Sequence, residues 1–177
     1  MTGRLIIITG VQAAGKTTVG RALAGLLPRA VHVDGDAVHR FVVSGEIPYD
    51  VPPPPGATEQ LYLRYRGSLA VARVYRDAGF DAVFTDNIFG ATLPDVLEMA
   101  AGPVHLIVLD PDHATVVARE TARDKTGYTD RITPELLMSA LREETPRWGL
   151  WWDSTGETAQ QTAAALSSRL AEAVVHP

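Results

Sequence analysis

Short apolar runs alternate along the chain with longer segments in which apolar residues recur at helical spacing. The runs have few polar interruptions, as strands do when both faces of a sheet are covered. The pattern predicts strands over residues 5–9, 30–34, 81–86, 104–109 and 149–153. It predicts helices over residues 16–27, 37–43, 58–78, 93–100, 114–125, 134–145 and 158–175. Because strands that alternate with helices form parallel βαβ units, we expect an α/β fold of three layers, in which a five-stranded parallel sheet carries helices on both faces.

Residues 47–56 interrupt this alternation with five prolines, four of them consecutive at positions 52–55. Proline removes a backbone donor and fixes φ, so this segment is expected to be a loop with a stiff extended stretch. A linker between two domains is the alternative, but the sequence on either side is too short for independent domains. At 177 residues the chain fits one domain, spanning residues 1–177.

The composition and net charge indicate which cellular compartment and which classes of binding partner to expect. The sequence contains no cysteine, which excludes disulfides, zinc–thiolate sites and thiol nucleophiles and suits a reducing cytoplasm. It has no apolar run approaching the roughly 20 residues of a membrane helix, and its first residues lack the apolar segment of a signal peptide. The net charge of −5 disfavours nucleic acid as a partner. We therefore expect a cytoplasmic protein without membrane association; its oligomeric state is left open.

The most specific motif lies between the first predicted strand and the first predicted helix. Residues 10–18 satisfy the P-loop pattern G-x-x-x-x-G-K-[ST] in full. In such a loop, glycines let backbone N–H groups surround a phosphate chain, the lysine reaches the β- and γ-phosphates, and the next hydroxyl ligates Mg²⁺. Lys16 and Thr17 take these two positions, with Thr17 as the metal ligand. The nucleotide-binding residues predicted from the motif are Gly10, Ala13, Ala14, Gly15, Lys16, Thr17 and Thr18.

Other sequence features distinguish among the P-loop proteins. The Asn-Lys-x-Asp motif of GTPases is absent, and Asp86 is followed by Asn87 rather than by the glutamate usual in motor ATPases. Small kinases remain, and they carry an arginine-bearing lid. We therefore expect an enzyme that binds ATP (or GTP) with Mg²⁺ and transfers the γ-phosphate to a hydroxyl of a small molecule.

Aspartates follow the strands that adjoin the P-loop. All strands of a parallel sheet end at one edge, where ligands bind, so Asp34, Asp36 and Asp86 should converge. Asp36 is the candidate that orients and deprotonates the acceptor hydroxyl; alternatively it only caps the helix that follows. Asp34 and Asp86 are expected to contact the substrate, and Asp86 could instead hold Mg²⁺ through water or be a turn residue. Which of the three is the base stays open.

Arginines form a second group of candidates. Arg119 and Arg123 share one helix face and precede a polar segment, residues 124–133, with the composition of a lid. We expect Arg119 to bind the nucleotide and Arg123 to act catalytically, because arginine suits the charge on a phosphoryl group in transfer. A solvated helix face is the alternative. Arg64, on the long helix, is expected to face the acceptor or else the surface.

The sequence also resembles known kinases. Residues 10–18, followed by Val33-Asp-Gly-Asp36 and His39, resemble gluconate and adenylylsulfate kinases. Ala13-Ala-Gly-Lys16 and the chain length resemble the chloramphenicol phosphotransferase-like antibiotic kinases. The resemblance implies the shikimate-kinase type of fold with a mobile lid. It implies Lys16 and Thr17 at phosphate and Mg²⁺, Asp36 near the acceptor hydroxyl, and Arg119 or Arg123 in the lid.

The resemblance is specific over about the first 40 residues and architectural beyond them, so the acceptor stays open between an antibiotic or other natural product and a sugar-like metabolite. Acceptor binding is expected within residues 37–78, with residues 44–56 lining or covering the pocket, and the lid within residues 119–133. A polynucleotide or nucleotide kinase is one alternative function, although it calls for a basic groove. A regulatory module that binds a nucleotide without transferring phosphate is another.

Overall fold

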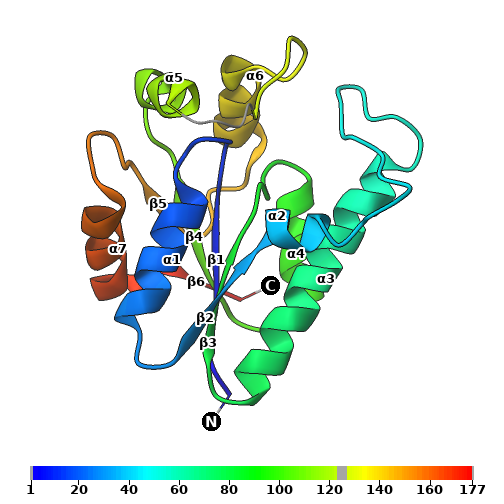
Figure 1. The fold of residues 1–177 in the computed structure, drawn as a ribbon. Coiled ribbons are helices and arrows are strands. Elements are labelled where there is room, and N and C mark those ends of the chain that lie inside the picture. The colour runs from blue at the N-terminus through cyan, green and yellow to red at the C-terminus, as the bar shows by residue number, and fades with distance from the viewer. Residues whose placement is uncertain (1, 123–126, 177) are drawn as a thin grey trace.

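The structure, a computed structural model, describes residues 2–122 and 127–176. Its centre is a parallel sheet in the order β2-β3-β1-β4-β5 (Figure 1). The five strands are β1 (Leu5–Gly10), β2 (Ala30–Asp34), β3 (Asp81–Thr85), β4 (Val104–Leu109) and β5 (Leu150–Trp152). The predicted α/β fold with five parallel strands is confirmed.

Helices cover the sheet on both sides, which gives the predicted three layers. Figure 1 shows α1 (Lys16–Leu26) and α7 (Ala159–Ser168) on one side, and α3 (Ala57–Asp77) and α4 (Thr92–Ala100) on the other. The short helix α2 (Gly35–His39) follows β2 directly. Two further helices, α5 (His113–Thr121) and α6 (Pro134–Ser139), lie above the edge at which the strands end.

The position of β1 at the centre of the sheet explains why residues 5–8 form an unbroken apolar run. Every residue of β1 is buried, and Ile6, Ile7 and Ile8 have no exposed surface. Strands β3 and β4 pair with β1 on its two sides, so that Ile7 lies opposite Phe84 in one neighbour and Leu106 in the other. A strand with a neighbour on each side and a helix layer on each face has no polar position to present to solvent.

The end of the chain departs from the prediction of one helix over residues 158–175. A capping box at Thr158 starts α7 as expected, but the helix ends at Ser168 and a 3₁₀ turn, Leu170–Ala173, follows. A short strand, β6 (Val174–Val175), then pairs antiparallel with the start of β4. Because β5 pairs only with residues 107–109 of β4, the first residues of β4 present an open edge that β6 covers.

Another helix boundary also differs from the predicted one. The helix expected over residues 134–145 ends at Ser139 and continues as one π-helical turn, Ala140–Glu144. After this turn, the Thr145 hydroxyl accepts a hydrogen bond from the Gly90 backbone at 2.8 Å, which ties the turn to the loop after β3.

Within the described ranges, no helix is both long enough and apolar enough to cross a membrane.

Candidate functional site

A cleft of about 600 Å³ opens at the edge where the strands end. Side chains that are far apart in the sequence meet in it, as the strand order requires. From the P-loop, it is lined by Ala13, Gly15, Lys16, Thr17 and Thr18. From the other elements, it is lined by Asp34, Asp36, Arg64, Asp86 and Arg119. The structure therefore brings together most of the residues that the sequence singled out.

The two other nucleotide-binding residues predicted from the motif, Gly10 and Ala14, lie outside the lining of the cleft. Ala14 is fully buried, and Gly10 lies at the end of the buried strand β1. Gly10 has φ of +146°, and a Cβ there would overlap the backbone oxygen of Leu109. Only glycine satisfies both conditions, so this position permits the chain to leave β1 and turn over the end of the sheet.

Lys16 begins α1 and folds back over the loop. Its Nζ donates a hydrogen bond to the Val11 backbone oxygen at 2.7 Å. The cation is thus held over the concave side of the P-loop, in the cleft, at the first turn of a helix whose dipole also favours an anion.

Arg119 connects the P-loop to the segment that follows β5. Its Nη1 donates to the backbone oxygen of Ala14 at 2.9 Å, and its Nη2 donates to the backbone oxygens of Ser154 and Glu157 at 3.0 and 3.3 Å. Arg119 therefore lies in the wall of the cleft instead of on a solvated helix face. Ser154 and Glu157, which follow β5 and were not predicted as site residues, also line the cleft.

The predicted lid is only partly described. Arg123 and the first residues of the segment 124–133 lie outside the described residues. From Gly127 onward, the segment rests on the P-loop, where the Tyr128 hydroxyl donates to the backbone oxygen of Gln12 at 2.6 Å. Further along, Arg131 forms an exposed ion pair with Asp50 at 3.3 Å. The mobility of this segment stays a prediction.

The region 37–78, in which acceptor binding was expected, contributes Arg64 to the lining of the cleft. Residues 44–56 lie outside that lining, and Figure 1 shows them extending from the start of α3 away from the sheet. Gln60 of α3 holds this loop through hydrogen bonds to the backbone of Gly45 and Ile47. That the loop covers a bound acceptor stays a prediction.

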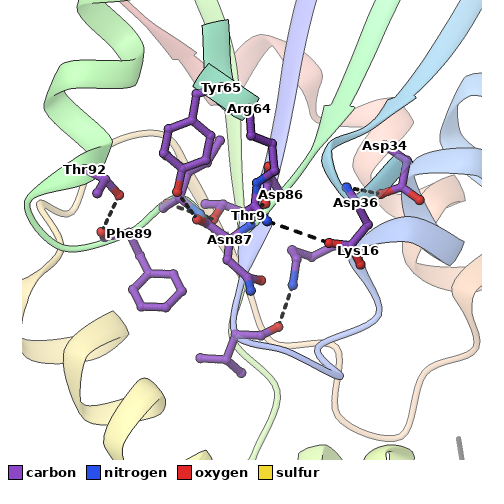
Figure 2. Close-up of polar contacts among 12 residues, drawn as sticks. Thr9, Lys16, Asp34, Asp36, Arg64, Tyr65, Asp86, Asn87, Phe89 and Thr92 are labelled. Carbon is purple, nitrogen blue, oxygen red and sulfur yellow. Dashed lines mark hydrogen bonds and ion pairs between the residues drawn. The ribbon is translucent and has the colours of Figure 1, made fainter. Parts of the chain in front are cut away.

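The two carboxylates of the Asp-Gly-Asp segment at the end of β2 have different roles. The helix α2 begins at Gly35, two residues earlier than predicted, and Asp34 is its N-cap, accepting a hydrogen bond from the Asp36 backbone at 3.1 Å. The alternative that Asp36 caps this helix is therefore wrong. Asp36 instead presents a side chain that is 50% exposed in the cleft (Figure 2).

Asp86 is the buried carboxylate of the site. Its side chain is only 3% exposed, and its Oδ1 lies 2.8 Å from Nη2 of Arg64 and accepts the Asn87 backbone N–H at 2.7 Å (Figure 2). The other amino group of Arg64, Nη1, lies 4.0 Å from Oδ1 of Asp36. Arg64 thus lies between two carboxylates that follow different strands, Asp36 after β2 and Asp86 after β3.

Two contacts fix the position of Asp86. The Thr9 hydroxyl donates to the Ile88 backbone oxygen at 2.7 Å and accepts the Ile88 backbone N–H at 2.8 Å, which ties the loop after β3 to the end of β1. On the other side, Gly35 leaves the space that the Asp86 carboxylate occupies, because a Cβ at this position would overlap Oδ2. Gly35 and Asn87 were not among the predicted site residues.

We expect Gly35→Ala to destabilise the fold by about 1–3 kcal/mol, because the added methyl must displace a buried carboxylate. It should also displace Arg64, since its guanidinium is paired with the Asp86 carboxylate. Gly25→Ala is the matched control: it lies in α1 with nothing within 4 Å of the added Cβ, and it should gain up to about 1 kcal/mol. Urea unfolding of both variants measures the difference; equal stabilities would contradict the tight contact at Gly35.

Burial raises the pKa of the Asp86 carboxyl to about 6, against the opposing effect of the Arg64 guanidinium and the Asn87 backbone N–H. Asp36 raises this pKa further and Lys16 lowers it. Because the folded-state pKa lies above the ordinary value of about 4, the folded protein binds the proton more readily than the unfolded chain. The contribution of Asp86 to stability should therefore decrease as the pH rises from about 4 to 6.

A carbon-detected NMR titration of the side-chain carboxyls tests this pKa, with the Asp86 resonance assigned through Asp86→Asn. We expect a titration midpoint near pH 6. Below that pH, the neutral acid should bind Arg64 more weakly than the carboxylate does. A midpoint near 4 would mean that the ion pair with Arg64 outweighs burial.

The sequence of residues 5–146 matches the profile of a protein family described as an AAA domain. A search of curated proteins found no significant match. Solved structures share the fold: a sugar kinase from Janibacter sp. HTCC2649 aligns with a TM-score of 0.70 and 18% identity over 97% of this chain and 96% of that one. The tunicamycin resistance protein of Deinococcus radiodurans aligns with a TM-score of 0.70 and 20% identity over 99% of each chain. Shikimate kinase from Acinetobacter baumannii, solved with shikimate, aligns with a TM-score of 0.66 and 21% identity over 96% of this chain and 94% of that one.

Proposed function

The chain belongs to the AAA domain family, and we propose that it is an ATP-dependent phosphotransferase that moves the γ-phosphate to a hydroxyl of a small molecule. The observation that carries this proposal is that Lys16 and Asp36 line one cleft. Lys16 suits the phosphates of the nucleotide, and Asp36 suits an acceptor hydroxyl that must lose its proton. A phosphoryl transfer needs these two functions on opposite sides of the transferred γ-phosphoryl group.

The nucleotide half of the cleft consists of the P-loop and Arg119. The loop presents its backbone around the phosphates, and Lys16 leaves the Val11 oxygen to contact the β- and γ-phosphates. Arg119 keeps the loop and the segment after β5 at a fixed distance through its three backbone contacts. This half should therefore be largely formed before the nucleotide binds.

The donor set fits Mg²⁺. The Thr17 hydroxyl and the Asp86 carboxylate line the same cleft, and Mg²⁺ is typically held by one or two such groups, phosphate oxygens and water. In the described parts of the chain, no three acidic or histidine side chains form a metal cluster, so phosphates would complete the site. The bound ion would neutralise charge on the phosphates.

The acceptor half is built around Asp36. As the acceptor oxygen forms its bond to the γ-phosphorus, the bond to the oxygen bridging the β- and γ-phosphorus breaks, and the hydroxyl proton passes to Asp36. Asp34 is committed to capping α2, and Asp86 is buried and paired with Arg64, which leaves Asp36 as the carboxylate most exposed to an acceptor. Arg64, paired with Asp86 and 4.0 Å from Asp36, holds these carboxylates in place on the acceptor side.

The acceptor is a small molecule in this proposal, a natural product or a sugar-like compound. Three carboxylates on the acceptor side disfavour a polynucleotide, whose phosphates would need a basic groove. The structural neighbours named as sugar kinase, shikimate kinase and tunicamycin resistance protein support a small acceptor. By the same likeness, antibiotic inactivation within the cytoplasm is one of the roles to be tested.

A panel of hydroxyl compounds, supplied with labelled ATP and Mg²⁺, tests the function directly. We expect ADP to form in equal amount with a phosphorylated acceptor, and only when the right acceptor is present. Nucleotide binding without transfer to any member would favour the regulatory module. ADP release that does not depend on an acceptor would indicate a hydrolase.

A further inference from the structure

The loop after β3 contains an asparagine, Asn87, whose place relative to the sheet bears on the reaction proposed above. Strand β3 lies between β2, which leads to Asp36, and β1, which leads to the P-loop. Thr85, the last residue of β3, pairs in register with Asp34 of β2 and with Ile8 of β1. Asn87 follows two residues later, so it leaves the sheet between the strand that leads to the proposed base and the strand that leads to the P-loop.

Hydrogen bonds on both sides fix the backbone of Asn87. Its N–H donates to Oδ1 of Asp86 at 2.7 Å, and its carbonyl oxygen accepts the Tyr65 hydroxyl at 2.6 Å (Figure 2). The next residue, Ile88, is held to Thr9 by two more hydrogen bonds, at 2.7 and 2.8 Å. Tyr65 and Thr9 are both buried, so these contacts are largely shielded from water. The turn therefore presents the Asn87 side chain from a rigid support.

The side chain of Asn87 is half-buried and lines the cleft, as does that of Lys16. Figure 2 shows both side chains extending beyond the ends of the strands. In the part of the chain that the structure describes, the hydrogen bonds of Asn87 use its backbone and none uses its amide group. An amide of this kind has two N–H donors and an acceptor oxygen. These groups are thus open to a ligand that enters between the P-loop and Asp36.

We propose that Asn87 is a catalytic residue whose side-chain amide donates a hydrogen bond to an oxygen of the γ-phosphoryl group, in a step that rests on the function proposed above. In that reaction the γ-phosphoryl group moves from the P-loop side toward Asp36, and Asn87 follows the strand between them. The bond changes are those already given, and Asn87 neither gains nor loses a proton. Because its backbone is fixed in advance, the donor needs no reorganisation as charge shifts over the phosphoryl oxygens.

Two substitutions at this position separate a donor from a structural role. Asn87→Ala removes the amide, and Asn87→Asp keeps its shape but replaces the donor with a negative charge. A hydrogen bond to a charged group corresponds to roughly 10- to 100-fold in affinity. We therefore expect Asn87→Ala to weaken the binding of AMPPNP, an ATP analogue that retains a γ-phosphate, by roughly 10-fold or more in the presence of Mg²⁺. Asn87→Asp should weaken it further.

ADP is the matched control ligand, because it lacks the γ-phosphate and should bind both variants as it binds the wild type. Isothermal titration calorimetry gives the dissociation constants, and thermal unfolding shows that the variants fold. A structural role would instead favour Asn87→Asp, which keeps the shape of the side chain. Tighter binding of AMPPNP by Asn87→Asp than by Asn87→Ala would therefore overturn the proposal, and so would equal losses of AMPPNP and ADP affinity.

Asn87 is the only asparagine in the sequence, so its amide can be observed by itself. Protein labelled with ¹⁵N at the asparagine side chain gives one pair of amide proton signals. We expect AMPPNP with Mg²⁺ to move one of these signals downfield by more than ADP does, because only AMPPNP supplies γ-phosphate oxygens. The same spectrum with both nucleotides would overturn the inference and leave the proposed transfer in place. A wild-type protein that binds neither nucleotide would instead remove the proposed function, and the inference with it.

Discussion

Lys16→Ala is expected to lower kcat by about 10²–10³-fold, the loss typical of removing one preorganised donor to a developing negative charge. The lysine lies at the start of α1 with its ammonium over the P-loop, where the β- and γ-phosphates of a bound nucleotide would replace the Val11 oxygen as its partner. Its contact with the phosphates strengthens as the γ-phosphoryl group separates, so the substitution should lower kcat more than it weakens nucleotide binding.

The fold should survive this substitution. Lys16 donates to the Val11 backbone oxygen, and one such hydrogen bond contributes about 1 kcal/mol net. Steady-state kinetics and thermal unfolding, measured on one preparation, separate the two effects. Arg66→Gln serves as the control, since it removes a cation outside the cleft. A kcat for Lys16→Ala within a few-fold of the wild type would exclude the P-loop assignment.

Asp36→Asn is expected to reduce kcat by about 10²–10⁴-fold, the range for loss of a general base, with the ATP dissociation constant nearly unchanged. The amide keeps the shape of the carboxylate but accepts no proton. Its position in the first turn of α2 should be unaffected, because Asp34 caps this helix.

Asp34→Asn and Asp86→Asn provide the comparison among the three carboxylates. If Asp36 is the base, Asp34→Asn and Asp86→Asn should both retain more turnover than Asp36→Asn. Asp86→Asn should also keep most of its stability at neutral pH, because burial raises the pKa of Asp86 and already disfavours the charge that pairs with Arg64. Unfolding measurements separate these cases. An unchanged kcat in Asp36→Asn would transfer the role of base to whichever of the other two variants lost its turnover without losing its fold.

How far the sequence predicted the site depends on how local each feature is. The P-loop is contiguous, so its residues could be assigned from spacing alone, and the parallel sheet followed from the alternation of strands and helices. The rule that strand ends converge placed Asp34, Asp36 and Asp86 in one cleft. These inferences needed no knowledge of side-chain contacts.

The features that the sequence did not predict depend on packing between distant segments. The pairing of Arg64 with Asp86 depends on which face of α3 meets the sheet, and the periodicity of that helix left Arg64 between the cleft and the surface. The requirement for glycine at position 35 comes from a side chain 51 positions later. The strand β6 forms because β5 is short, although Val174 and Val175 read locally as the end of a helix.

The place of β1 at the centre of the sheet has a consequence for the biosynthesis of the protein. Its two neighbours are β3 and β4, which the ribosome makes 76 and 99 residues later, counted between the first residues of the strands. Until then, β1, which is buried at every residue in the folded protein, and the P-loop that follows it have no partner, and such a largely apolar segment is prone to aggregation. The nascent chain therefore depends on β4 to bury β1, and a translational pause before that strand would prolong the interval in which a chaperone is needed.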